Sequence, residues 1–322
     1  MNLLVAVNPT AGAGAARKAA QAAVGSLTAL GHVVTVHAGP SYSALADRVR
    51  SAVAEASESS VQGAKLRTSL DALIVVGGDG MVQLGANILA GTAVPLGIVA
   101  TGTGNDVART LDLPLKDPEA AALVIHEALL APPRWMDLGR ISRDPDGGGA
   151  LWFAGACSAG FDAVVNARAN SWSWPRGKSR YILAVLRELA VFRPRDYELM
   201  IDGSAESRTA MLVSVTNGRS IGGGMNITPE ALCDDGLLDL LVVSAVSRLR
   251  LITMLPRLFA GTHVSHPAVR IEKVSSVRVE VAGLTVFADG EPVGPAPVQI
   301  DVVPRALRVL RPAKSEVPGR SR

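Results

Sequence analysis

Four short apolar runs in the first third of the chain constrain its fold more than any other feature. They cover residues 3–7, 33–36, 73–76 and 96–99, and Ala- and Leu-rich stretches of helical character separate them. Runs that are apolar at every position, rather than at alternate positions, are typical of parallel strands covered on both faces. We therefore expect residues 1–132 to form an α/β domain around an open, mainly parallel sheet.

The character of the sequence changes after the prolines at 132 and 133, which end a helix expected over residues 119–130. Short strand-like runs follow, with Gly, Pro and Asp-Gly turns between them, at residues 212–215, 237–243, 277–281, 284–288 and 298–302. This pattern is typical of an antiparallel β-sandwich. Residues 133–311 are predicted to form this second domain, with helical insertions near 178–191 and 249–259, and residues 312–322 a disordered tail.

Composition narrows the class of protein. Lys and Arg together exceed Asp and Glu by only 3 (32 against 29), which gives no support to a nucleic-acid partner. Cys157 and Cys233 show neither paired metal-ligand spacing nor a disulfide framework, which fits a reducing compartment. No apolar run approaches the roughly 18 residues of a membrane span, and the first eight residues lack the basic start of a secretory signal. We expect a cytoplasmic protein.

Missing motifs disfavour three nucleotide-binding classes. The chain has neither a Gly-x4-Gly-Lys-Ser/Thr P-loop nor the His-Arg-Asp and Asp-Phe-Gly pair of protein kinases. Residues 12–17 follow the first run and imitate a dinucleotide fingerprint, but Arg17 stands where the third Gly belongs. No Asp or Glu occurs before Asp47 to bind a ribose, so a Rossmann dehydrogenase is disfavoured as well.

A polar, Gly-rich loop follows three of the four expected strands. Ligands of open α/β sheets bind at the carboxyl ends of the strands, where backbone N–H groups and helix N-termini attract anions. Three such loops on one rim favour a phosphate-bearing ligand. The loops contain Asn8, Pro9, Thr10, Ala11 and Gly12 after the first strand, Gly77, Gly78, Asp79 and Gly80 after the third, and Gly102, Thr103, Asn105 and Asp106 after the fourth.

Asp79 has two interpretations. In the functional one, its carboxylate holds a magnesium-bound phosphate or a substrate hydroxyl beside the Gly-rich backbone. In the structural one, it caps the helix expected over residues 81–89 at a tight turn. The loop alone does not separate the two.

Taken together, these motifs resemble the catalytic family of diacylglycerol kinases, which includes soluble bacterial lipid kinases and sphingosine kinases. The motifs occur in family order from residue 2 to about residue 311, at residues 8–12, 77–80, 102–109, 160–163, 229–231, 234–239 and 289–291. Each is weak alone, and the ordered set is specific.

The resemblance implies that ATP and a lipid acceptor meet in a cleft between the two domains. It implies a nucleotide site at the three Gly-rich loops. It also implies a magnesium site formed by Asp235 with neighbouring backbone oxygens, which maps to Asp235, Leu232 and Leu237. It also implies that the last carboxylate of the Asp-Gly-Glu motif, Glu291, is the catalytic base, with Asp289 and Asp79 as further candidate catalytic carboxylates.

The chain departs from the family pattern directly after Asp79. Family members continue with Thr and then Asn-Glu, whereas Met81, Gln83 and Leu84 stand here. The lost hydroxyl and carboxylate remove two polar contacts to ATP or its metal, so altered nucleotide affinity or activity is an open alternative.

The acidic motifs also have structural interpretations. Without the family, Asp289-Gly290 and Asp235-Gly236 are more simply hairpin turns, because Asp-Gly between strand-like runs is a strong turn signal. Glu291 is less easily explained in this way. It precedes Pro292, which favours an extended backbone and would fix the direction of the carboxylate.

Residues 168–195 combine cations with aromatic side chains. Seven Arg or Lys residues stand against the single acid Glu188, and Trp172 and Trp174 lie among them. A solvated helix face over core aromatics explains this segment, and so does an interfacial patch that attracts anionic lipids. The second interpretation predicts a transient, peripheral association with a membrane surface.

The sequence therefore predicts an ATP- and Mg²⁺-dependent lipid kinase that acts on diacylglycerol or a related lipid. An NAD kinase, which shares the Gly-Gly-Asp-Gly loop and a two-domain plan, is the enzymatic alternative. A non-catalytic nucleotide or lipid sensor is the alternative from another class, because of Met81 and Leu84. The acceptor and the oligomeric state, a homodimer included, stay open.

Overall fold

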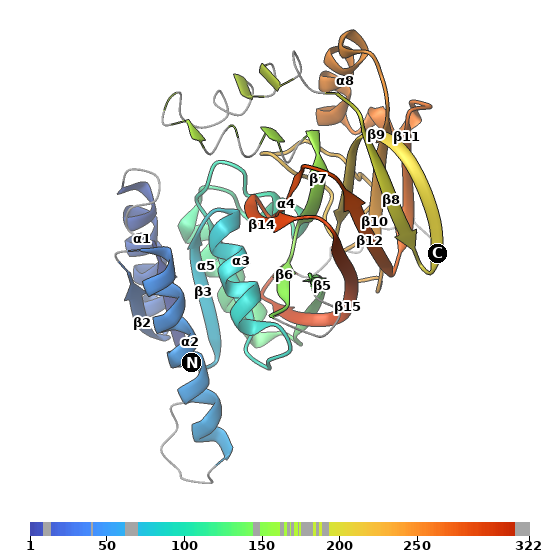
Figure 1. Cartoon of the computed structure of the whole chain (residues 1–322). Helices are drawn as coiled ribbons and strands as arrows, with labels where there is room; N and C mark the ends of the chain where they lie inside the picture. The colour runs from blue at the N-terminus through green and yellow to red at the C-terminus, as the bar shows by residue number, and fades with distance from the viewer. Residues whose placement is uncertain are drawn as a thin grey trace, which may run out of the picture.

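The computed structural model describes residues 1–8, 14–39, 41–61, 70–143, 149–161, 164–165, 168, 171–172, 174, 183–184, 187–188 and 193–312. Its amino-terminal part is an α/β layer and its carboxyl-terminal part is built mainly from antiparallel strands (Figure 1). No helix in these ranges combines the length and apolar character that a membrane span needs.

The first sheet is parallel and has the strand order β4-β3-β1-β2. Its strands coincide within a few residues with the four apolar runs: β1 (Asn2–Val7), β2 (Val33–Ala38), β3 (Ala72–Gly77) and β4 (Leu96–Ala100). The runs in β1, β3 and β4 are buried, as parallel strands between two helix layers should be. The run in β2 is not, because β2 has a single neighbour at the sheet edge, and Val33 is 65% exposed.

Helices cover both faces of this sheet. Two apolar clusters divide alternate residues of β1: Leu3 and Val5 pack on one side, and Leu4 and Ala6 on the other. The first side belongs to α1 (Ala15–Ala29) and α5 (Pro118–Leu130), and the second to α2 (Tyr42–Val61), α3 (Asp79–Leu89) and the short α4 (Asp106–Thr110).

The second part packs its strands around a separate apolar cluster. Its strand pairs are antiparallel, and α8 (Arg248–Ala260) and the 3-10 helix η2 (Thr262–Ser265) lie between β10 and β11. The strands are β5 (Arg134–Ser142), β6 (Leu151–Phe153), β7 (Ala156–Gly160), β8 (Arg195–Ile201), β9 (Ser204–Thr216), β10 (Leu238–Ser244), β11 (Val269–Val274), β12 (Ser276–Val281), β13 (Thr285–Ala288), β14 (Glu291–Pro295) and β15 (Val298–Val309).

The predicted α/β and sandwich architecture is thus confirmed. The helical insertion predicted at 249–259 is α8. Of the insertion predicted at 178–191, residues 183–184 and 187–188 are helical, and its other residues lie outside the described ranges, as do residues 313–322 of the predicted tail.

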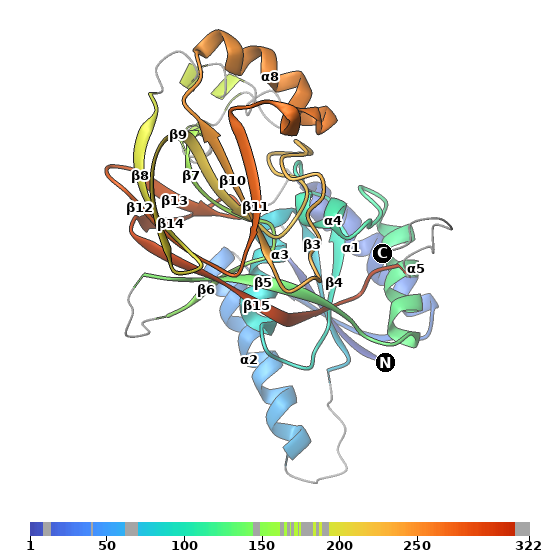
Figure 2. The same ribbon diagram turned by 90° about the vertical axis from the view of Figure 1, so that its right-hand side faces the viewer.

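Strand β15 ties the two parts together. It pairs with β5 and β12 in the second part, and its last residue, Val309, pairs in parallel with Leu96 of β4. Figure 2 shows this strand running from the sandwich to the α/β sheet. The boundary predicted at residue 132 falls between the end of α5 and the start of β5. One strand is therefore shared by the two parts.

Candidate active site

The loops after β3 and β4 approach each other at two glycines. A Cβ atom on Gly102 would lie 2.4 Å from the Cα of Gly78, closer than a side chain permits. The backbone N–H groups of Thr101 and Gly102 both donate to the carbonyl of Gly77, at 2.9 and 3.3 Å. The two predicted Gly-rich loops therefore form one surface. Asn8 directly follows β1, which pairs with β3, and Pro9, Thr10, Ala11 and Gly12 lie outside the described residues.

Asp79 caps a helix, but not the one that follows it. Its Oδ1 accepts the backbone N–H groups of Asp106 (2.7 Å) and Val107 (3.2 Å), which open α4. The cap residue of its own helix α3 is Gly78, which makes no side-chain cap. A carboxylate at the N-terminus of α4 is favoured by the helix dipole and by the free N–H groups there.

Asp106 connects α4 to the second domain. Its Oδ2 accepts the backbone N–H of Gly223, and its Oδ1 that of Gly224, each at 2.9 Å. These glycines belong to a turn between β9 and β10 in which Gly222, Gly223 and Gly224 all have positive φ. No sequence motif predicted this pairing with Asp106.

Asp289 follows β13, and both oxygens of its carboxylate accept hydrogen bonds. Oδ2 accepts the backbone N–H of Ala154 at 2.8 Å, and Oδ1 accepts those of Gly155 at 2.8 Å and Ala156 at 3.0 Å. The residue has φ 48°, as expected for the hairpin turn that the Asp-Gly pair predicted. This carboxylate therefore fixes the β13–β14 turn against the loop before β7.

Glu291 is the first residue of β14 and is exposed. Its Oε1 lies 3.8 Å from the position that a Cβ on Gly80 would take, so it faces the loop after β3. Among the described residues its carboxylate has no hydrogen bond or ion pair. The extended start of β14 agrees with the effect expected of Pro292.

Burial raises the pKa values of this group, and repulsion between neighbouring carboxylates adds to the effect at Asp79 and Asp289. Burial, with the nearby Asp106 charge, raises the pKa of Asp79 to about 6. Burial raises the pKa of Asp289 to about 6 in spite of its three backbone N–H donors. Partial burial also raises the pKa of Glu291. Three carboxyl groups with raised pKa values beside a Gly-rich rim are typical of a functional site.

Tyr42 is a neighbour that sequence reasoning missed. Its hydroxyl donates to the carbonyl of Gly80 at 3.4 Å, and burial together with the charges of Glu291 and Asp289 raises its pKa to about 12. It begins α2, and no motif marks it.

The three positions that depart from the family pattern have structural roles here. Met81 and Leu84 are buried in the core of the α/β layer. Gln83 is also buried, and its Nε2 donates to the carbonyl of Ala288 at 3.1 Å, directly before Asp289. Gln83 therefore joins α3 to the turn that carries Asp289.

Asp235, the predicted magnesium carboxylate, makes its contacts with residues other than Asp79, Asp289 and Glu291. The Oδ1 of Asp235 accepts the N–H of Leu237 at 3.1 Å, and its Oδ2 lies 2.9 Å from the ammonium of Lys273. The Leu232 side chain is 52% exposed. No cluster of three or more His, Cys, Asp or Glu side chains suited to a metal ion occurs in the described part of the chain. One oxygen of the Asp235 carboxylate therefore already faces a cation, and the other accepts a backbone N–H.

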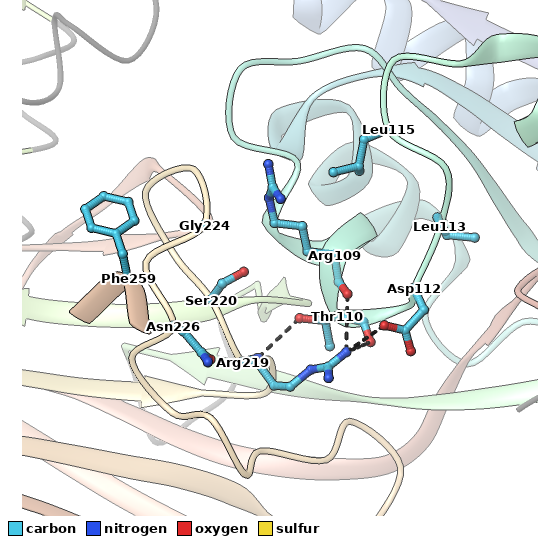
Figure 3. Close-up of a pocket in the computed structure, with 10 residues that line it drawn as sticks. All are labelled: Arg109, Thr110, Asp112, Leu113, Leu115, Arg219, Ser220, Gly224, Asn226 and Phe259. Carbon is cyan, nitrogen blue, oxygen red and sulfur yellow. Dashed lines mark hydrogen bonds and ion pairs between the residues drawn. The ribbon is translucent and has the colours of Figure 1, made fainter. Parts of the chain in front are cut away.

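A cavity of about 600 Å³ lies beside the Asp106 contact. Figure 3 shows it between α4 and the segment that carries Arg219, Ser220 and Asn226. The Arg219 guanidinium donates to the carbonyls of Arg109 and Thr110, both at 3.3 Å, and to Asp112 at 2.9 Å. These bonds hold the second domain to the end of α4.

Comparison with known families assigns the class of protein that this fold and site define. A model of the diacylglycerol kinase catalytic domain matches residues 2–140, and a model of the YegS C-terminal NAD kinase beta sandwich-like domain matches residues 155–311. The chain is 40% identical over 307 residues to a diacylglycerol kinase of Mycobacterium tuberculosis, covering 95% of this chain and 93% of the relative. It therefore belongs to the diacylglycerol kinase family of lipid kinases.

More distant relatives agree. The chain is 32% identical to a probable lipid kinase YegS-like protein of Pseudomonas fluorescens, over 78% of this chain and 80% of the relative. A crystal structure of a diacylglycerol kinase from Bacillus anthracis str. Sterne superposes with a TM-score of 0.68 at 20% identity, over 97% of this chain and 96% of the other. At 20% identity the superposition supports only a shared fold.

Proposed function

We propose that the chain is an ATP-dependent kinase that phosphorylates the hydroxyl of diacylglycerol and forms phosphatidate. The observation that carries this proposal is the contrast among three carboxylates. Asp79 and Asp289 accept backbone N–H groups, whereas Glu291 accepts none from the described residues and faces the Gly-rich loop at Gly80. A primary hydroxyl is a poor nucleophile at neutral pH, so its phosphorylation is helped by a free carboxylate that removes its proton.

In the proposed reaction, Glu291 takes the proton of the acceptor hydroxyl. The acceptor oxygen bonds to the γ-phosphorus of ATP as the bond from that phosphorus to the β,γ-bridging oxygen breaks, and ADP leaves. Residues 77–80 and 102–106 would hold the triphosphate, because the glycines let an anion approach the backbone closely beside the N-terminus of α3. Magnesium enters with ATP as part of the substrate and neutralises phosphate charge.

Asp79 and Asp289 act in this proposal mainly by position. Asp289 holds the turn that carries Glu291, and Asp79 joins the nucleotide loop to α4. Asp79 keeps its Oδ2, which accepts no hydrogen bond from the described residues, so this oxygen is free to order the acceptor hydroxyl or the metal of MgATP.

A peripheral contact with the membrane completes the proposal. Helix α8 buries Leu251 and Met254 but exposes Ile252 (43%) and Phe259 (52%), which lie seven residues apart and so share a face. From residue 240 to 271 the chain contains no Asp or Glu and four Arg. Trp174, in the basic aromatic segment, is 80% exposed, while Arg168 pairs with Glu188 at 2.7 Å. Exposed apolar side chains among cations suit an anionic lipid surface.

The test is incubation with γ-labelled ATP, MgCl₂ and three separate acceptors: diacylglycerol in mixed vesicles, sphingosine and NAD. We expect the label in phosphatidate. Label in phosphorylated sphingosine would change the acceptor class, and label in NADP would establish the NAD kinase alternative. Binding of ATP with no transfer to any acceptor would favour the sensor.

A further inference from the structure

Residues 234–237, which we call the Asp235 loop, lie directly before β10. A cation from a neighbouring strand, Lys273, contacts this loop. Lys273 lies on β11 directly opposite Asp239 of β10 in the antiparallel register. Its ammonium is 2.9 Å from Oδ2 of Asp235 and 3.0 Å from Oδ2 of Asp239. One side chain thus bridges the loop and the strand that follows it.

The carboxylates of this loop are satisfied within the chain. Arg311 pairs with Asp234 at 2.6 Å, and the second oxygen of Asp235 accepts the N–H of Leu237. Asp137 accepts the N–H of Gly236 at 2.7 Å and that of Arg305 at 2.7 Å. Asp234, Asp235 and Asp137 therefore each have a cationic or N–H partner.

Burial makes the Lys273 contacts consequential. The Asp239 side chain is only 5% exposed, so its charge is poorly solvated, whereas the side chains of Asp235 (24%) and Lys273 (36%) are partly exposed. Removing one partner of a buried ion pair leaves an uncompensated charge, which destabilises a fold more strongly than loss of an exposed pair. A dication at Asp235 would have to displace the ammonium or lie beside it, and two cations at that separation repel each other.

We propose that the ammonium of Lys273 is the resident cation of the Asp235 loop, in the place that a divalent ion would take. The loop is then organised without a divalent ion, and the divalent ion that the kinase reaction uses is confined to the nucleotide. This inference concerns the loop only and does not depend on the identity of the acceptor.

The test is thermal unfolding of the full chain in EDTA and in millimolar MgCl₂ or CaCl₂, with Asp235→Asn as the reference for the loop. We expect Mg²⁺ or Ca²⁺ to raise the Tm of the unsubstituted protein no more than it raises the Tm of Asp235→Asn. Such an Asp235-dependent rise would overturn the proposal, because it would show a divalent ion bound at this loop with Lys273 in place.

Two substitutions of Lys273 sharpen the comparison. Lys273→Met keeps an apolar stem but removes the charge, so Tm in EDTA should fall, and Mg²⁺ or Ca²⁺ should recover part of the loss. Lys273→Arg keeps a cation and should leave Tm close to that of the unsubstituted protein, without divalent dependence. A Lys273→Met protein as stable in EDTA as the unsubstituted chain would also contradict the proposal. If Lys273→Met does not fold, the unsubstituted protein and Asp235→Asn still decide.

Discussion

The carboxylate of Asp79 accepts the backbone N–H of Asp106 at 2.7 Å, and this bond joins the loop after β3 to the first turn of α4. The Asp106 carboxylate in turn accepts N–H groups from Gly223 and Gly224 in the second domain. A short series of hydrogen bonds therefore runs from the Gly-Gly-Asp-Gly loop across the domain junction. Because the series begins at a residue of the proposed phosphate-binding surface, its integrity bears on both stability and catalysis.

Substituting Asp79 in two ways separates its cap from its charge. Asp79→Asn keeps an oxygen that accepts the α4 N–H groups, so the Tm should change little, while phosphoryl transfer should fall at least roughly a hundredfold. Asp79→Ala removes the cap as well and should cost about 1 kcal/mol of unfolding free energy in addition. The labelled-ATP assay and thermal unfolding measure the two effects. Near-normal turnover in a folded Asp79→Asn protein would restrict Asp79 to the cap.

Gly104 is expected to be intolerant of a side chain. A Cβ there would lie 2.5 Å from Oδ2 of Asp79 and 3.2 Å from Oδ2 of Asp106. Gly104→Ala should therefore displace both carboxylates and lower Tm and turnover together. Gly25→Ala is the matched control, because Gly25 lies in α1 with nothing within 4 Å of its Cβ position, and Ala there should stabilise the helix by up to about 1 kcal/mol. Equal effects of the two substitutions would contradict this role.

The buried carboxyl groups predict a pH dependence of stability. The pKa of Asp289 rises from 3.8 to about 6 on folding, so the native state holds more protons than the unfolded chain between these values. The contribution to the unfolding free energy is then fully present below about pH 4 and is lost as the pH rises through about 6, by up to about 3 kcal/mol. Asp79, with a similar pKa, acts in the same direction.

Denaturant unfolding between pH 4 and pH 7 measures this slope. Asp289→Asn should be less stable throughout, because its amide offers one oxygen to three N–H groups, and its slope should be shallower than that of the unsubstituted protein. Asp47→Asn is the control, since Asp47 is an exposed carboxylate on α2, and it should keep the full slope. An unchanged slope in Asp289→Asn would show that Asp289 does not cause the pH dependence of stability.

The strands of the α/β sheet could be predicted from the sequence because their signal is local. Continuous apolar runs report burial on both faces, and they located β1, β3 and β4 within a few residues. The same signal could not show that β2 lies at the edge, because strand order depends on packing between distant segments. The Asp-Gly turn at Asp289 was likewise predicted from local chemistry, and its three N–H donors more than 130 residues away were not.

The contacts that define the site are mostly non-local. Asp106 and Gly223 are 117 residues apart, and no spacing rule links them. Lys273 faces Asp235 across 38 residues because of a strand register that the sequence does not display. Family resemblance supplied the candidate carboxylates. Geometry then divided them into those with hydrogen bonds and one, Glu291, without a partner among the described residues.

The exposed face of α8 predicts salt-sensitive binding to anionic vesicles. Ile252→Ser with Phe259→Ser should weaken sedimentation with phosphatidylglycerol vesicles and raise the apparent KM for diacylglycerol in vesicles, while activity on a short-chain soluble acceptor is kept. Leu123→Ser with Leu130→Ser is the control, because both leucines are exposed on α5 of the other domain (Figure 1). Equal loss in both double variants, or equal loss on both acceptors, would assign the effect to folding or to the cleft.

The free carboxylate at the start of β14 gives the sharpest test of the mechanism. Glu291→Gln keeps the size of the side chain and the extended backbone before Pro292 but cannot accept a proton, so phosphorylation of diacylglycerol should fall by roughly 10²–10⁴-fold. ATP affinity should change little, because the triphosphate is placed at the Gly-rich loops and not at this side chain. Glu280→Gln, an exposed glutamate on β12, is the matched control and should leave both quantities unchanged. If turnover survives in Glu291→Gln while ATP still binds, the base is another group, and Asp79 is the next candidate, since its raised pKa and unbonded Oδ2 suit it to receive a proton.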